Sequence, residues 1–198
     1  ANSIVLNEEL ERAEFAFPVV LQPGPARLTC SFKGTLNDKL RGFYRSTWKD
    51  ESGHERVIAT TQFESTNARR AFPCFDEPDL KASFGVTLRV DSSLMAVSCG
   101  ELISSTELDD GRREDTFADT MVMSTYLVAF IVGELEATEA VNVDGVPLRI
   151  VHVPGKGALT EFGLAAAEFS LRWLVDYYDI PYPAGKLDLI AVPDFAFG

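Results

Sequence analysis

The amino-acid sequence predicts a mainly β protein: a saddle-like antiparallel β-sandwich followed by the start of an α/β domain. Two observations carry this expectation. As far as Glu139, short segments alternate between apolar and polar residues and are separated by turn signals, which is typical of packed antiparallel sheets. Beyond Glu139 the pattern changes to a strand, a long helix and another strand, which is the first part of an α/β unit. We therefore expect a β domain at residues 1–139 and an incomplete second domain at residues 140–198.

Within the first region, three segments stand out as strands. Leu28 to Lys33 and Phe84 to Val90 alternate between apolar and polar residues, so each is expected to be half-buried. The segment from Val122 to Val132 is apolar with little alternation, which predicts a central strand covered on both faces. Turn signals rich in Pro, Gly and Asp separate the strands at residues 22–25, 50–53 and 109–111.

The second region is expected to form a strand at Val146–Val153, a helix at Leu159–Tyr178 and a strand at Leu187–Val192. One face of the helix is defined by apolar residues at steps of three and four: Leu159, Phe162, Ala166, Phe169, Trp173 and Tyr177. The opposite side also carries apolar residues: Leu164, Leu171, Leu174 and Tyr178. A helix that is apolar almost all round is expected to be covered on several sides.

Composition narrows the class of protein. The formal net charge of −12 argues against nucleic acid and anionic membranes as partners, because like charges repel. The cysteines, Cys30, Cys74 and Cys99, are odd in number and form no C-x-x-C pair, so we expect no disulfide framework and a reducing, cytoplasmic location. No basic-then-apolar leader opens the sequence. The longest apolar run, residues 126–132, is far below the roughly 18–20 residues that cross a bilayer.

No catalytic residue and no metal site are predicted within these residues. A catalytic zinc site usually takes three protein ligands, and the chain has only two histidines, His54 and His152. Neither lies in a His-Glu-x-x-His motif, and His54 is expected in a hairpin loop. No nucleophile elbow, P-loop or dinucleotide-binding motif is present, and the cysteines lack the surroundings of a nucleophile.

The segment 61–78 is dense in charged and aromatic residues. Because its prolines impose an irregular backbone, we expect Arg69, Arg70, Asp76 and Glu77 to form internal salt bridges and turn caps.

Gln62 and Glu64 in the same segment have two readings. At i and i+2 of an extended segment their side chains point the same way, so they are able to form a polar floor for a cation. Such pairs are also common at ordinary strand edges, and the sequence pattern alone leaves both readings open.

Nearly the whole chain resembles the zinc aminopeptidases of the aminopeptidase N and puromycin-sensitive type, which are gluzincin metallopeptidases. The stretches that carry the resemblance are residues 35–46, 61–78, 123–130, 153–157, 180–183 and 192–195. The first of them leans towards the puromycin-sensitive, cytosolic branch.

The resemblance implies a saddle-shaped β domain ahead of a thermolysin-like catalytic domain. It implies an enzyme that binds one zinc ion through His-Glu-x-x-His and a later glutamate, and that removes N-terminal amino acids from peptides with a free N-terminus. Glu64 matches the glutamate that binds the substrate's α-amine, with Gln62 beside it, and Gly198 matches the first residue of the Gly-Ala-Met-Glu-Asn motif. We therefore expect substrate binding at Glu64, Gln62 and Gly198.

The departures from the family pattern concern both ends of the sequence. The zinc ligands and the rest of the exopeptidase motif would lie beyond Gly198, and in the family further strands precede the position of Ala1. The chain alone is therefore expected to bind no zinc and to be inactive. Two alternatives remain: a non-catalytic β-sandwich module for protein interaction, and an inactive scaffold related to the enzymes. A helix that is apolar all round favours the enzyme fragment over the self-standing module.

Overall fold

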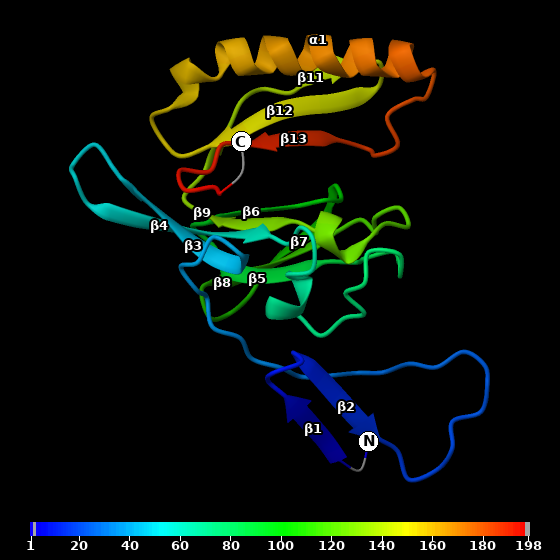
Figure 1. The fold of residues 1–198 in the computed structure, drawn as a ribbon. Coiled ribbons are helices and arrows are strands. Elements are labelled where there is room, and N and C mark those ends of the chain that lie inside the picture. The colour runs from blue at the N-terminus through cyan, green and yellow to red at the C-terminus, as the bar shows by residue number, and fades with distance from the viewer. Residues whose placement is uncertain (2, 197–198) are drawn as a thin grey trace.

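The computed structural model describes residues 1 and 3–196, and its elements are stacked in layers (Figure 1). The strands of this part of the chain are β1 Ser3–Asn7, β2 Arg12–Ala16, β3 Gly42–Lys49, β4 Glu55–Gln62, β5 Thr87–Asp91, β6 Met95–Ser98, β7 Leu102–Glu107, β8 Arg112–Phe117, β9 Phe130–Gly133, β10 Glu136–Ala137, β11 Val141–Val143, β12 Val146–His152 and β13 Leu187–Ile190. The α-helix is α1, Glu161–Tyr178, and the 3-10 helices are η1 Ala68–Arg70, η2 Thr125–Leu127 and η3 Gly157–Leu159. The prediction of a mainly β fold with one long helix and a final strand is confirmed.

The strands of residues 1 and 3–196 form four sheets. In the middle of the molecule lie a sheet of order β3-β4-β9-β6 and a three-stranded sheet of order β5-β8-β7, both antiparallel. Strand β12 pairs with β10 and β11 in antiparallel fashion and with β13 in parallel. Strands β1 and β2 make a separate hairpin at the opposite end of the molecule from α1 (Figure 1).

The β3–β4 hairpin shows how local sequence fixes the fold. The Asp50 carboxylate accepts hydrogen bonds from the backbone N–H groups of Ser52 and His54, and Gly53 takes a φ of +79°, which a residue with a side chain rarely adopts. The turn expected at residues 50–53 is therefore present.

A hydrophobic core joins the middle of the molecule to the layer of β12. Ile58 of β4, Val97 of β6 and Ile131 of β9 pack with Val151 and Val153, and all five are buried. Strands on both sides of residue 139 thus share one core.

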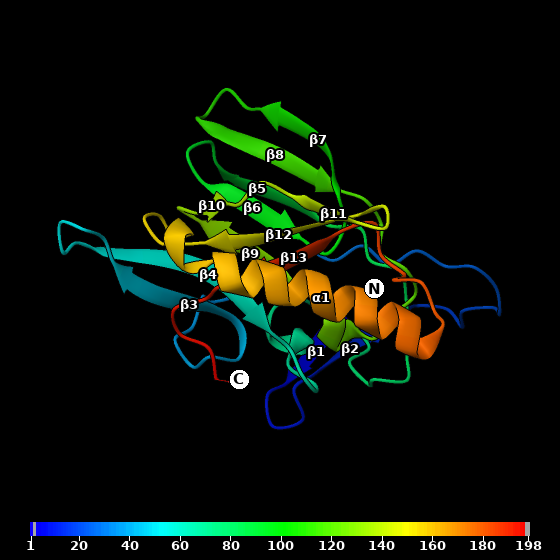
Figure 2. The ribbon, with the colours of Figure 1, turned by 90° about the horizontal axis from the view of Figure 1, so that it is seen from above.

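The strand-helix-strand unit predicted for the second region is confirmed. Helix α1 lies across β12 and β13 (Figure 2), and Leu171 packs on Val143 and Leu148. The helix ends at Asp179, which adopts the left-handed conformation, and Pro181 follows. No helix of the described residues is long and apolar enough to cross a membrane.

The covering expected on several sides of α1 is present on one side. Large apolar side chains on its outer face are exposed by half or more: Phe162, Phe169, Trp173 and Tyr177. Trp173 stacks on Tyr177 with the ring centroids 4.8 Å apart.

Two strand predictions were wrong in part or in full. Residues Leu28 to Lys33 form no strand, and Leu28 and Phe32 are both more than half exposed. No strand in the described part of the chain pairs with this segment, and alternation without a ladder partner does not make a strand. The expected strand at Phe84–Val90 begins later, at Thr87, as β5.

The central strand expected from Val122 begins at Phe130, as β9, which does lie inside its sheet between β4 and β6. Before it, the chain turns through η2. The Ser124 hydroxyl donates to the Pro78 carbonyl and the Thr125 hydroxyl donates to Asp76, so these side chains hold the backbone away from the sheet.

Candidate functional site

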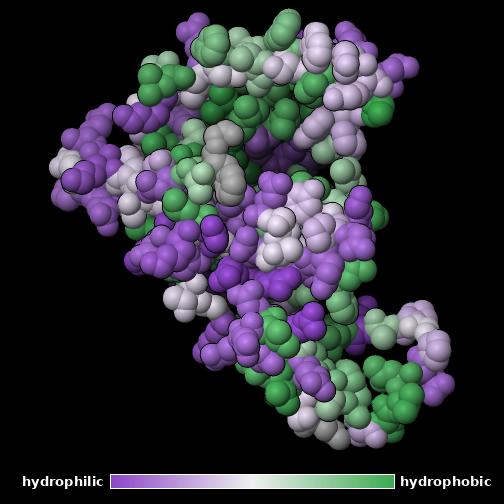
Figure 3. Space-filling view, in the orientation of Figure 1, coloured by the Kyte–Doolittle hydropathy of each residue, from purple (hydrophilic) through white to green (hydrophobic). Residues whose placement is uncertain are grey.

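A cleft of about 1090 Å³ lies between the β3-β4-β9-β6 sheet and the chain on either side of β13, and it is visible as a hollow below the layer of α1 (Figure 3). One side is lined by the ends of β4, β6 and β9, and the other by Tyr182–Asp188, Ile190–Val192 and Phe195. Both parts of the predicted domain organisation therefore contribute to it.

The β13 side of the cleft carries a charged network. Lys186 Nζ donates to the Ser98 carbonyl at 2.7 Å and also to the Asp188 carboxylate, which accepts from Arg149 Nε at 2.7 Å. Burial raises the pKa of Asp188, but the hydrogen bonds and charges of Arg149 and Lys186 outweigh it and hold the pKa below the usual value. This network fixes the Lys186 segment against the end of β6.

The side of the cleft lined by β4, β6 and β9 is held by hydrogen bonds between neighbouring segments of the β3-β4-β9-β6 sheet. The Phe130 N–H donates to the Thr61 hydroxyl at 3.2 Å, and the Ala129 N–H donates to Cys99 Sγ at 3.1 Å. Burial raises the pKa of the Cys99 thiol, which keeps it protonated and makes it a poor nucleophile. This side of the cleft combines a few polar groups with apolar side chains such as Val97, Phe130 and Ile131.

The structure separates Gln62 from Glu64. Strand β4 ends at Gln62, whose partner Gly42 is the first residue of β3, so the ladder stops there. Gln62 lines the cleft, whereas Glu64 follows in a turn and is not among the cleft residues. The expectation that both side chains extend from one strand is thus wrong, because the strand has no partner beyond Gln62.

The turn that carries Glu64 is well anchored. Phe63 is 2% exposed and meets the rings of Phe72 and Phe130 edge to face. The Asn67 N–H donates to the Phe63 carbonyl at 2.8 Å, the Asn67 amide donates to the Glu64 carbonyl, and the Glu64–Ser65 peptide bond is cis. The Glu64 carboxylate itself is exposed, and within residues 1 and 3–196 it takes part in no salt bridge. Gly198, the third expected binding residue, lies outside the described residues.

Of the internal salt bridges expected in segment 61–78, the one between Arg69 and Asp76 is present, whereas Arg70 pairs outside the segment and Glu77 is exposed and takes part in no salt bridge among the described residues. Asp76 is 3% exposed and accepts from the backbone N–H and Nε of Arg69 and from the Thr125 hydroxyl. Arg70 pairs with Glu11 at 2.8 Å and with the Asn67 side chain. These contacts hold η1, which follows the Glu64 turn directly.

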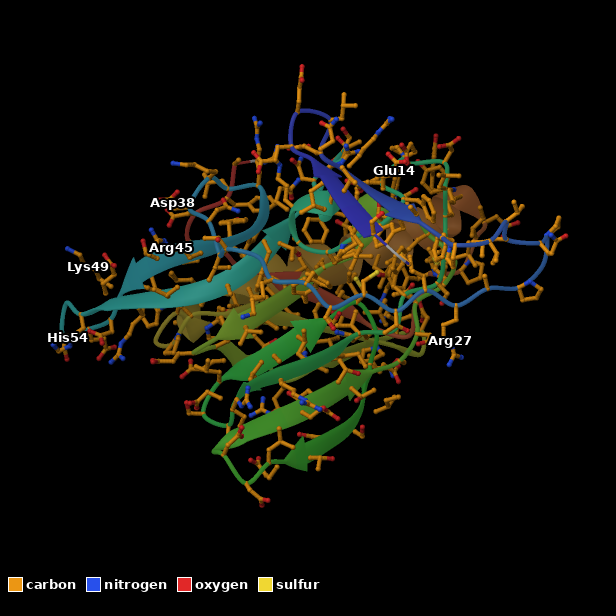
Figure 4. All side chains as sticks on the ribbon, turned by 90° about the horizontal axis from the view of Figure 1, so that it is seen from below. Glu14, Arg27, Asp38, Arg45, Lys49 and His54 are labelled. Carbon is orange, nitrogen blue, oxygen red and sulfur yellow. The ribbon has the colours of Figure 1, made fainter. Side chains whose placement is uncertain are left out.

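The two histidines lie on different elements. His54 is at the free end of the β3–β4 hairpin (Figure 4), and its side chain is exposed and 3.7 Å from Asp50. His152, at the end of β12, is buried, with Nδ1 2.8 Å from the Val153 carbonyl. Across the described part of the chain no three His, Cys, Asp or Glu side chains come together in a way that could hold a metal ion.

Sequence reasoning missed the Lys186–Asp188–Arg149 network. Its sequence signal was the i, i+2 spacing of Lys186 and Asp188 at the start of the predicted strand, since Lys186 directly precedes Leu187 and an extended backbone places both side chains on one face. Arg149 is far away in the sequence, and its contact depends on the parallel pairing of β12 with β13, in which Arg149 lies opposite Asp188.

Comparison with known proteins agrees with this architecture. Residues 1–127 match the family described as the peptidase M1 N-terminal domain. The chain therefore belongs to the peptidase M1 family, and the resemblance found in the sequence is confirmed.

The relatives it matches are aminopeptidases. The chain is 48% identical over 193 residues to the puromycin-sensitive aminopeptidase of Caenorhabditis elegans, which covers 97% of this chain and 20% of that protein. It is 42% identical to the human endoplasmic reticulum aminopeptidase 1, and that match covers 88% of this chain and 18% of the relative. It is also 42% identical to the alanine/arginine aminopeptidase of Saccharomyces cerevisiae, and that match covers 97% of this chain and 23% of the relative. The chain thus spans about a fifth of the length of these relatives.

Proposed function

We propose that this chain is the N-terminal part of a zinc-dependent aminopeptidase that removes N-terminal amino acids from peptides. The observation that carries the proposal is the 48% identity, over 97% of the chain, to a puromycin-sensitive aminopeptidase. Residues 1–139 form the β domain, and residues 140–198 form the beginning of the catalytic domain. The enzyme acts in the cytoplasm, a location that the unpaired cysteines favour.

Glu64 binds the α-ammonium of the substrate in this proposal. An exposed carboxylate without a salt bridge in the described chain is suited to the task, because a charge-assisted hydrogen bond contributes roughly 1.5–3 kcal/mol. Gln62, in the adjacent cleft, and Gly198 support binding of the substrate's N-terminal end. The requirement for a free N-terminus makes the enzyme an exopeptidase.

The zinc ion of the complete enzyme is not held by the residues described here. His54 and His152 lie on different elements, and no suitable group of three ligands occurs among the described residues, so they do not fit a zinc site. When bound, zinc would polarise the scissile carbonyl and activate a water molecule. The residues of this chain contribute substrate binding and the shape of the cleft, and the chain alone is inactive.

Hydrolysis of an aminoacyl anilide by the complete protein that contains this chain tests the proposal. We expect turnover that a chelator abolishes and added zinc restores, together with one zinc per molecule by elemental analysis. The 198-residue chain alone should show neither zinc nor turnover after dialysis. A complete protein without chelator-sensitive turnover would overturn the proposal.

A further inference from the structure

Lys186 joins two layers of the molecule. It directly precedes β13, which lies in the layer of α1 (Figure 1), and its Nζ donates to the Asp188 carboxylate of that strand. The same Nζ donates at 2.7 Å to the carbonyl of Ser98, the last residue of β6 in the β3-β4-β9-β6 sheet. We call the contacts of this ammonium group with Asp188 and Ser98 the Lys186 bridge.

The Lys186 bridge is largely shielded from solvent. The Lys186 side chain is 13% exposed and that of Asp188 is 7% exposed. The Asp188 carboxylate also accepts from Arg149 Nε of β12 at 2.7 Å, so cations from two segments balance its charge. An exposed ion pair readily exchanges its partners for water, whereas a buried pair keeps them, because an unpaired buried charge is strongly destabilising. The bridge is therefore a fixed link between the two layers.

The bridge also crosses the cleft. Lys186 and Asp188 line one side of it, and Ser98 and Gln62 line the other. The shared apolar core joins the same two layers, but apolar contacts are not directional. A hydrogen bond instead fixes both a distance and a direction. The bridge is thus suited to set the spacing between the two sides of the cleft.

This spacing matters for the proposed function, on which the inference rests. Glu64, the proposed ammonium ligand, directly follows the core residue Phe63 at the end of β4, whereas β12, α1 and β13 begin the catalytic domain. In an α-amino substrate one carbon separates the ammonium group from the scissile carbonyl, so both groups reach their sites only when the two layers lie at one spacing. We propose that Lys186 is a positioning residue that sets this spacing, and that it thereby favours α-amino over β-amino substrates.

The test compares glycyl and β-alanyl anilides as substrates of the complete enzyme. They differ by one methylene between the ammonium group and the carbonyl. Lys186→Met removes both hydrogen bonds and keeps a side chain of similar length. It should lower kcat/KM about tenfold for the glycyl substrate, and lower the ratio of glycyl to β-alanyl kcat/KM at least about threefold, because a spacing that is no longer fixed discriminates less between them. An unchanged ratio would overturn the inference, since a loss of folded enzyme lowers both values equally.

Two further variants complete the comparison. Lys186→Arg keeps a cation that is able to donate to both acceptors, so its ratio should stay within about twofold of wild type. A ratio as low as that of Lys186→Met would contradict the inference. Lys156→Met, the same change at an exposed lysine before η3, is the control and should leave both substrates unaffected.

Calorimetry of each variant checks that it is folded. If Lys186→Met does not fold, Lys186→Gln, whose amide keeps one donor, replaces it in the same comparison. Absence of turnover in both the wild-type enzyme and Lys156→Met would contradict the proposed function and not the role of Lys186.

Discussion

Two carboxylates of the segment 61–78 differ in burial, and this difference indicates which one stabilises the fold and which one is available to bind a ligand. Asp76 is 3% exposed, and Arg69 and Thr125 donate three hydrogen bonds to it. Glu64, in the same segment, is exposed and has no salt bridge in the described residues. A buried carboxylate must exchange its water for protein donors, whereas an exposed one is able to exchange its water for a ligand. The comparison indicates that Asp76 is committed to the fold and that Glu64 is free to bind.

The largest effect should come from Asp76→Ala in the isolated chain. Arg69 and Thr125 would lose a buried, charged acceptor, so the free energy of unfolding should fall by about 3 kcal/mol. Urea denaturation measures this change. Glu77→Ala, an exposed neighbour, serves as the control and should change stability by less than ~0.5 kcal/mol. An Asp76→Ala chain as stable as the control would remove the distinction between the two carboxylates.

A smaller effect, and one of a different kind, is expected from Glu64→Ala in the complete enzyme. Loss of the ammonium partner should lower kcat/KM by at least ~10-fold, which corresponds to 1.4 kcal/mol. Zinc content and thermal stability should stay near wild type, because the exposed side chain makes no salt bridge in the described structure. Steady-state kinetics with an aminoacyl anilide measure the first effect, and calorimetry the second. Full activity in Glu64→Ala would return this residue to the class of ordinary surface carboxylates.

The smallest effect at neutral pH should come from ionisation of Tyr44, because this buried acid stays protonated there. It provides a further test of how burial acts on an ionisable side chain. Burial, and secondly the charge of Asp194, raise the pKa of Tyr44 to about 12 from the ordinary value of 10.0. Because the folded-state pKa is the higher one, its stabilising contribution is complete below pH 10 and is lost as the pH rises from 10 to about 12. Ultraviolet titration should show late ionisation together with unfolding, and both Tyr44 and Tyr182 should contribute to it, because burial raises the pKa of Tyr182 as well. In Tyr44→Phe the late step should lose the Tyr44 contribution; an unchanged late step would assign it to Tyr182.

The sequence predicted those parts of the molecule that depend on local patterns. Helix α1 and strand β12 lie close to their expected limits, because a regular apolar period over many residues has one main interpretation. The same reasoning failed at Leu28 to Lys33, where the alternation is present and the partner strand is not. It also failed before Phe130, where the hydroxyls of Ser124 and Thr125 hold the chain in a turn that a hydropathy pattern cannot reveal.

The candidate site was harder to predict, because many of its contacting residues are far apart in the sequence. Gln62 and Glu64 were found through a local motif, but the end of β4 that separates them depends on where β3 begins, at Gly42. The hydrogen-bond partners of Asp194 lie in β3, 147–150 residues earlier in the sequence, and no pattern near Asp194 indicates them. Contacts of this kind follow from topology, which must be known first.

The core shared across residue 139 has a consequence for how the chain folds. Val151 and Val153 complete the packing around Ile58, Val97 and Ile131. A chain cut at residue 139 would therefore expose these apolar residues of the β3-β4-β9-β6 sheet to water. The two proposed domains therefore differ in architecture, but we expect them to unfold as one cooperative unit. The two parts should melt in a single transition, and neither is expected to persist as a folded intermediate without the other.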